Sequence, residues 1–132
     1  MGKKYLIDSN ILIEYAGNLF PKNIHSALST IVDDDFIISF ITKIEVLGHY
    51  TADRAWHNFI NLASIFGADD NIIEQTILLR RDHKIKVPDA IIAATALVNN
   101  YTLLTRNIAD FKKIPNLKME NPWLWEPDTD VS

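Results

Sequence analysis

Apolar and polar positions alternate along the chain in a way that separates short buried strands from amphipathic helices. YLI (5–7), FIISF (36–40) and YTLLT (101–105) are strand-length stretches rich in apolar residues. Such stretches are typical of strands that are buried on both faces. The segments between them carry apolar residues at spacings of three and four, as helices do. The pattern therefore predicts a mainly parallel central sheet covered by helices, a three-layer α/β sandwich.

The same pattern gives approximate bounds for the remaining elements. We expect helices over 9–15, 23–33, 41–50, 52–62, 71–81 and 88–99, a brief helix from Asn107, and short strands over 64–67 and 117–120. No repeat or internal linker interrupts the 132 residues, a length that suits one domain. We expect a single domain over 1–125 and a polar tail over 126–132, where Val131 is the one apolar residue.

Composition narrows the classes of function. A hydrophobic content of 48% is sufficient for a core. The net charge of −4 argues against an extended basic surface that binds nucleic acid, so any phosphate binding must be local. The chain has no cysteine, which excludes disulfides and thiolate metal sites, and its four histidines show no metal-ligand spacing. No apolar run is long enough to span a membrane and KKYLID does not begin a signal peptide. We expect a cytoplasmic protein.

Acidic side chains follow the predicted strands. In open α/β sheets ligands gather beyond the carboxyl ends of the strands. Asp8 follows the first strand, Glu45 falls in the first turn of the helix after FIISF, and Asn107 and Asp110 follow YTLLT. Asp89 heads the apolar helix VPDAIIAATAL, although sequence does not show at which end of the sheet that helix begins.

Several carboxylates at one rim repel one another unless a cation offsets their charge. Carboxylates without cysteines or paired histidines suit Mg²⁺ or Mn²⁺ better than Zn²⁺. An acidic cluster that holds such a metal is a common solution for phosphodiester hydrolysis. The residues themselves thus point to metal-dependent cleavage of a nucleic-acid backbone.

Each polar position also has a purely structural interpretation. Ser, Thr, Asn and Asp cap helices, acids suit a first helical turn, and cations suit a last one. Arg80 and Arg81 can be read as cations at a helix C-terminus, and Ser9, Asn10 and Thr105 as ordinary polar residues at strand and helix ends. Thr42-x-x-Glu45 and Asn107-x-x-Asp110 can each be a capping box. Asp8 can cap a helix through an Asx-turn, and Asp89 can be an acid in a first helical turn that begins with Pro88.

The order and spacing of five motifs resemble a known family. These are YLIDSNILIEY, SFITKIEVLGH, IIEQTILLRRDHKIKVPDAIIAATAL, LLTRNIADF and NPW, which together span Tyr5 to Trp123. The combination is similar to the PIN-domain ribonucleases, and within them to the VapC-type toxins of toxin-antitoxin pairs. The resemblance implies a PIN-like fold and Mg²⁺- or Mn²⁺-dependent endonucleolytic cleavage of RNA.

Site roles follow from this resemblance. Asp8, Glu45 and Asp89 match the three core acidic positions, with Asp8 and Asp89 as direct metal ligands and Glu45 as a ligand or an aid to the attacking water. Many family members carry a fourth acid where this chain has Asn107, and others carry it where Asp110 stands. Asp110 would then complete the carboxylate set and Asn107 would offer a neutral oxygen, which weakens the case for a tightly held second metal.

The resemblance also implies partners. Ser9, Asn10 and Thr105 are candidates to orient a carboxylate or hold a phosphate, and Arg80 and Arg81 are candidates to contact RNA or a partner. Such toxins are blocked by a small antitoxin protein, are usually homodimers, and often act on structured RNA such as tRNA. Nothing in the sequence indicates a membrane partner.

Three alternative classes of protein can be compared with the sequence. A haloacid-dehalogenase-like phosphatase needs a second acid where Asn10 stands, and a Mg²⁺-binding receiver domain needs paired acids after its first strand, where Ser9 follows Asp8. A receiver domain also needs a lysine after its last strand, where Arg106 follows Thr105. The third is a catalytically inactive PIN fold that serves as a binding module.

Overall fold

The computed structural model describes residues 3–126 and contains the elements that the hydrophobic pattern predicts. Its strands are β1 (Tyr5–Ile7), β2 (Ile37–Ser39), β3 (Ser64–Phe66), β4 (Thr102–Leu104) and β5 (Met119–Glu120). Its helices are α1 (Ser9–Ala16), α2 (Lys22–Asp34), α3 (Phe40–Leu47), α4 (Arg54–Ile60), α5 (Asp70–Asp82), α6 (Val87–Asn99), α7 (Ile108–Phe111) and the short 3-10 helix η1 (Pro122–Leu124). Apart from Glu126, the predicted tail lies outside the described residues. In the described part of the chain, no helix combines the length and apolar character that crossing a bilayer requires.

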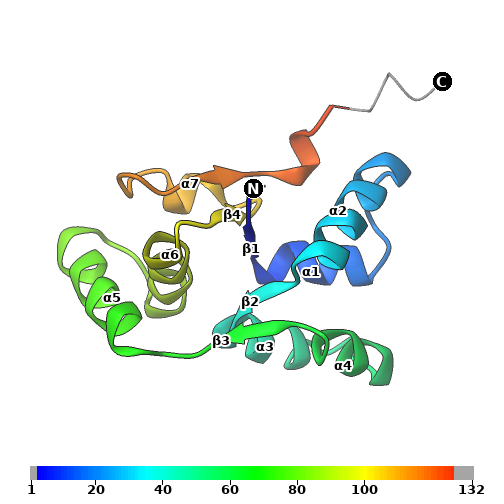
Figure 1. Cartoon of the computed structure of the whole chain (residues 1–132), viewed down its shortest axis with the longest axis horizontal. Coiled ribbons are helices and arrows are strands. Elements are labelled where there is room, and N and C mark those ends of the chain that lie inside the picture. Colours follow the sequence, from blue (N-terminus) through cyan, green and yellow to red (C-terminus); the bar gives the residue numbers. More distant parts are fainter. Residues whose placement is uncertain (1–2, 127–132) are drawn as a thin grey trace.

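The strands pair in parallel, as predicted. β4 lies between β1 and β5, and β2 pairs with β3. β2 also lies in contact with β1. In the β1–β4 pair, Tyr5 is opposite Thr102 and Ile7 is opposite Leu104. Figure 1 shows these strands in the middle of the molecule, with α5 and α6 on one side and α1, α2 and α4 on the other.

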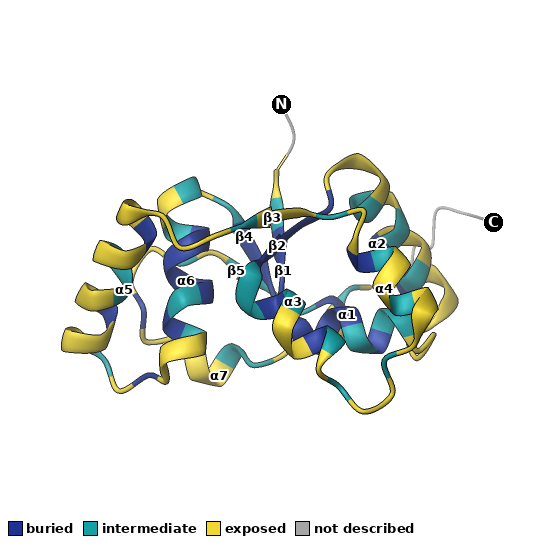
Figure 2. Ribbon diagram, turned by 90° about the horizontal axis from the view of Figure 1, so that it is seen from below, coloured by how far each residue is buried: buried dark blue, intermediate teal, exposed yellow. Residues whose placement is uncertain are grey.

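Alternation along each strand divides the core into two clusters. Leu6, Ile37 and Leu103 belong to the cluster that includes α5 and α6. Their strand neighbours Ile7, Ile38 and Leu104 belong to the cluster that includes α1 and α2. Because successive strand side chains point to opposite faces, apolar residues at every position bury both faces of the sheet. The buried residues accordingly face the strands from both helical layers in Figure 2, which confirms the three-layer sandwich.

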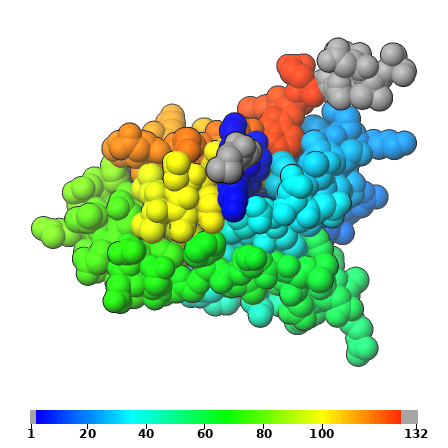
Figure 3. Space-filling model, in the orientation of Figure 1, coloured from blue at the N-terminus to red at the C-terminus, as the bar shows by residue number. Residues whose placement is uncertain are grey.

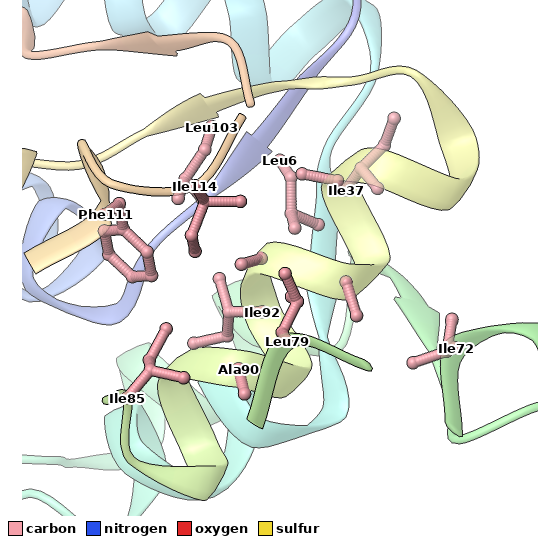
Figure 4. Close-up of a cluster of buried hydrophobic side chains, with 13 residues drawn as sticks. Leu6, Ile37, Ile72, Leu79, Ile85, Ala90, Ile92, Leu103, Phe111 and Ile114 are labelled. Atoms are coloured by element: carbon pink, nitrogen blue, oxygen red, sulfur yellow. The ribbon is translucent and has the colours of Figure 1, made fainter. Parts of the chain in front are cut away.

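The start of α6 is held close to α7 by a shared core. Ile85, in the connection before α6, is buried in the same cluster as Phe111 and Ile114, which come from α7 and the turn after it. Figure 4 shows these three side chains around Ile92 of α6. In Figure 3 the orange atoms of the later segment lie against the yellow atoms of α6. Segments that carry Asp89 and Asp110 are therefore brought together by apolar packing.

Leu103 offers a test of this core because its side chain is fully buried in the middle strand of the three-stranded sheet. Leu103→Ala should lower the free energy of unfolding by about 2–5 kcal/mol, since it removes buried methyl groups and leaves a cavity. Leu62→Ala is the matched control, because Leu62 is 77% exposed and its truncation should change stability by less than about 0.5 kcal/mol. Urea unfolding of both variants measures the difference. Equal losses would contradict the described burial.

Candidate active site

Asp8 is held at the carboxyl end of β1 by contacts to both of its carboxylate oxygens. It is the N-cap of α1, and its Oδ1 accepts a hydrogen bond of 2.8 Å from the backbone N–H of Ser9. Its Oδ2 accepts a hydrogen bond of 2.8 Å from the Thr105 hydroxyl. The Asx-type cap predicted from the sequence is thus present. Asp8 is also only 6% exposed, which is unusual for a carboxylate that serves merely as a cap.

Thr105 links Asp8 to the segment that follows β4. Its backbone N–H donates to the Glu120 carbonyl, and its fully buried hydroxyl accepts a hydrogen bond of 3.0 Å from the Asn107 N–H while it donates to Asp8. One hydroxyl can both donate and accept, so it joins these two groups without leaving a polar atom unpaired. Asn107 therefore lies beside Asp8. Its backbone N–H makes the contact to Thr105, and its side chain makes no cap hydrogen bond.

Glu45 reaches the same region from α3. The Ser9 hydroxyl donates a hydrogen bond of 2.5 Å to Glu45 Oε1, so Ser9 connects Asp8 and Glu45. The Glu45 residue is exposed, whereas Ser9 is buried. A carboxylate in this position is anchored at one oxygen and open to solvent elsewhere.

The helix predicted from residue 41 begins at Phe40, but the predicted Thr42-x-x-Glu45 capping box is wrong. Ser39, the last residue of β2, is the N-cap of α3 and accepts a hydrogen bond from the Ile41 N–H, so helix follows strand directly. Glu45 consequently lies beyond the first turn, and Thr42 is a buried helical residue rather than a cap. Within residues 3–126, Thr42 Oγ1 has no hydrogen-bond partner. A serine that caps efficiently at the strand end explains why the helix begins early.

The second capping box, Asn107-x-x-Asp110, is also not formed. Asn107 stands at the N-cap of α7, but its side chain makes no cap hydrogen bond. The contact between the two residues is instead a backbone hydrogen bond of 3.0 Å from the Asp110 N–H to the Asn107 carbonyl. The acidic side chain of Asp110 is therefore not engaged in the reciprocal cap that the sequence suggested.

Asp89 lies in the first turn of α6, as predicted, with Pro88 before it. Burial raises the pKa of Asp89, and the negative charges of Asp110 and Glu45 raise this pKa further, while Lys86 opposes the shift. The pKa of Asp8 is likewise raised, mainly by burial. The hydrogen bonds from Thr105 and Ser9 oppose that shift, and the charges of Glu45 and Asp89 add to it.

Charge effects on the pKa of Asp8 and Asp89 link the four predicted acids into one electrostatic group. Asp8 is influenced by Glu45 and Asp89, and Asp89 by Glu45 and Asp110. Their side chains do not form a ready-made metal cluster, however. Among residues 3–126, no three His, Cys, Asp or Glu side chains are grouped closely enough to hold a metal ion as they stand.

Three further residues support this site and were not among the predicted site residues. Glu14, on α1, is only 8% exposed and pairs with Arg106, whose Nη1 lies 3.0 Å from Glu14 Oε2. The indole N–H of Trp123 donates a hydrogen bond of 2.9 Å to Glu14 Oε1. Because Arg106 follows Thr105 directly, these contacts tie the Thr105 segment to α1. The sequence signal for Glu14 was its position three residues after the buried Ile11, on the inner face of a helix.

The two predicted contact arginines lie at the end of α5. Arg80 Nη1 donates a hydrogen bond of 2.5 Å to the Ile85 carbonyl, which braces the connection between α5 and α6. Arg81 is exposed in the last turn of α5. Both positions fit the helix C-terminus interpretation, and their contact with RNA or a partner stays a prediction.

Comparison with known proteins identifies the family. The model of the PIN domain family matches residues 5–117, so the chain belongs to the PIN-domain family. It is 30% identical over 130 residues to ribonuclease VapC2 of Rickettsia felis, across 89% of this chain and 96% of the relative.

Solved structures agree with this assignment. A toxin-antitoxin complex from Klebsiella pneumoniae has a chain with a TM-score of 0.71 and 30% identity, over 90% of this chain and 98% of that one. The structure of VapBC2 from Rickettsia felis bound to a DNA fragment from its promoter gives a TM-score of 0.70 and 27% identity, over 92% and 98% of the two chains. The predicted PIN fold and the likeness to VapC-type proteins are thus confirmed.

Asp89→Asn should stabilise the metal-free protein at neutral pH. The native Asp89 carboxyl has a raised pKa, so the native state retains this proton to a higher pH than the unfolded chain does. The free energy of unfolding therefore falls as pH rises from the usual aspartate pKa of about 4 to the native pKa, and the asparagine variant avoids that loss. Thermal unfolding in EDTA should show a higher melting temperature for the variant at pH 7, with the gain shrinking toward pH 4. A gain that is the same at both pH values would contradict the electrostatic cause.

Glu14→Gln should destabilise the protein by about 1–2 kcal/mol, because it removes the charge that Arg106 and Trp123 contact. The expected loss is below that of a fully buried ion pair, since the Arg106 side chain is 50% exposed. Glu74→Gln, an exposed position on α5, is the control and should change little. Urea unfolding of the two variants measures both effects, and a Glu14→Gln protein as stable as the control would refute the structural role.

Proposed function

We propose that the protein is a metal-dependent endoribonuclease that acts as the toxin of a VapBC-type toxin-antitoxin pair. The observation that carries this proposal is the gathering of four acids: Ser9 joins Asp8 to Glu45, and Asp89 and Asp110 line one cleft. Charge effects on the pKa of Asp8 and Asp89 link the two pairs. The similarity to ribonuclease VapC2 of Rickettsia felis and to chains of toxin-antitoxin complexes supports it.

The donor chemistry of this group fits Mg²⁺ or Mn²⁺. All four side chains offer hard carboxylate oxygens, and burial, followed by repulsion from neighbouring acids, raises the pKa of Asp8 and Asp89. A divalent cation relieves that repulsion and needs oxygen ligands, some of which are commonly waters. Among residues 3–126 no three acidic side chains are grouped closely enough to hold a metal alone, so waters would supply the remaining ligands. In this proposal Asp8 and Asp89 hold the metal, Asp110 completes the carboxylate set, and Asn107 offers a neutral oxygen.

Residues of the chain would position the metal, the attacking water and the phosphate. A bound Mg²⁺ or Mn²⁺ would supply an activated water and neutralise charge on the phosphate. Asp8 cannot rotate freely, because Ser9 N–H and the Thr105 hydroxyl hold its two oxygens. Glu45 is exposed and anchored at Oε1 by Ser9, so its other oxygen can accept a proton from the attacking water. Asn10, in the first turn of α1, is the proposed residue to orient a phosphate or a carboxylate.

The proposed partners are an RNA substrate, with tRNA as the first kind to test, and a small antitoxin protein that blocks the acids. A homodimer is the proposed assembly. The family match excludes the receiver-domain and dehalogenase readings. A catalytically inactive PIN module remains the alternative function, and the experiment below separates it from an enzyme.

The test is cleavage of a total cellular RNA pool by the purified, partner-free protein in Mg²⁺ or Mn²⁺. Discrete fragments are expected, and EDTA should abolish them. Asp89→Asn should lower the cleavage rate by at least about 100-fold, because changes that only support metal ligands already cost 10–100-fold. Asp70→Asn makes the same chemical change at an exposed position of α5 and should leave the rate unchanged.

Calorimetric titration with Mn²⁺ completes the design. The wild type and Asp70→Asn should bind the ion, and Asp89→Asn should bind it more weakly. A wild-type protein that neither binds Mn²⁺ nor cleaves RNA would overturn the enzyme proposal in favour of the inactive module. Binding without cleavage would direct the search to narrower RNA substrates.

A further inference from the structure

A cleft of about 240 Å³ opens directly beside two of the candidate acids. This volume is below the roughly 300–1,000 Å³ of pockets that enclose a drug-sized ligand. It suits a smaller group, such as one phosphate with part of its sugar. The residues that line the cleft are Lys84, Ile85, Lys86, Asp89, Ala109, Asp110 and Lys113.

Core packing explains why lysines line this cleft. On one wall Ile85 is buried, which leaves the lysines on either side of it exposed. On the other wall Phe111 and Ile114 are buried, and Lys113 between them is exposed. Figure 4 shows the three apolar side chains in one cluster. These anchors fix the backbone of both walls, so the lysines face the cleft mouth from positions that the core determines.

The cleft lysines are not consumed by ion pairs within the described residues. The ion pairs found over 3–126 join Lys3 to Glu120, Lys4 to Asp35 and Arg106 to Glu14. Lys84, Lys86 and Lys113 thus keep their ammonium groups available for an anion. A protein of net charge −4 needs such local cations if RNA is to approach its acidic group.

We propose that this cleft binds a phosphodiester of the RNA next to the bond that is cut, with Lys84, Lys86 and Lys113 as its phosphate contacts. The inference rests on the proposed function and specifies how the substrate lies. Asp89 and Asp110 face the reacting phosphate, and the three lysines hold the neighbouring one. The backbone is thereby directed over the α6 start and α7, independently of base identity.

The experiment compares two double variants with equal loss of charge. Lys84→Gln/Lys113→Gln removes one lysine from each wall, and Lys86 is left intact because its charge acts on Asp89 directly. Lys4→Gln/Lys118→Gln is the control, because these residues directly precede β1 and β5 and so lie at the amino ends of the strands, away from the acids. Binding of a labelled tRNA pool is measured in EDTA over a range of salt, and steady-state cleavage of the same pool is measured in Mg²⁺.

The cleft variant should bind the tRNA pool about tenfold more weakly than the control, with KM for cleavage raised by a similar factor and kcat within about twofold. The slope of log association constant against log salt should become shallower by about 0.7 for each phosphate that the variant no longer neutralises. Mn²⁺ affinity should match that of the control, because neither lysine is a metal ligand.

An affinity and salt slope equal to those of the control variant would overturn the inference, even if RNA is cleaved normally. Weaker capture of an acidic protein partner, with RNA affinity unchanged, would also overturn it. Lysine-dependent RNA binding by a protein that neither binds Mn²⁺ nor cleaves RNA would support the phosphate contacts of the cleft and contradict the endonuclease. The two proposals therefore fail by different measurements.

Discussion

The parallel register between β1 and β4 is the constraint on which the rest of the site depends. It sets Ile7 opposite Leu104, so the next residues along the two strands, Asp8 and Thr105, meet although they are 97 positions apart in the chain. The hydroxyl contact between them fixes a carboxylate that burial alone would make unfavourable. A slip of one residue would turn every strand side chain to the other face and also separate this pair. The hydrophobic core and the acidic site therefore depend on the same register.

Apolar packing and charge act against each other at this end of the sheet. Packing of Ile85, Phe111 and Ile114 brings two acidic segments together, and like charges at close range raise the energy of the native state. The core is extensive enough to hold that arrangement. The clustered negative charge destabilises the native state without a bound cation, and the same charge would bind a cation. Functional sites commonly lower stability in this way. Glu14 and Arg106 differ from the clustered acids, because they carry opposite charges and their ion pair stabilises the loop beside the site.

The strands and helices could be predicted because the hydrophobic pattern reflects burial directly. Leu6 and Ile7 are both apolar, and both faces of β1 are indeed buried. Helix boundaries were less predictable, because a helix can begin at any of several nearby polar residues that are able to cap it. Ser39 and Thr42 are both suitable caps by residue type, and only the length of β2 decides between them. Asp8, Glu45 and Asp110 were singled out because they follow strands, and Asp89 because it is the one carboxylate at the head of an apolar helix. Glu14 was missed, because its role requires two partners, Arg106 and Trp123, that are distant in sequence.

The direct passage from β2 to α3 has a consequence for how this fold can vary. Ser39 ends the strand and Phe40 begins the helix, so no loop residue lies between them. Each helical residue advances the side-chain direction by about 100°. An inserted or deleted residue at this joint would have no loop to absorb it, and it would rotate Glu45 away from Ser9. Length changes in related chains should therefore gather in the exposed connections, while the distance along the chain from Ser39 to Glu45 stays constant.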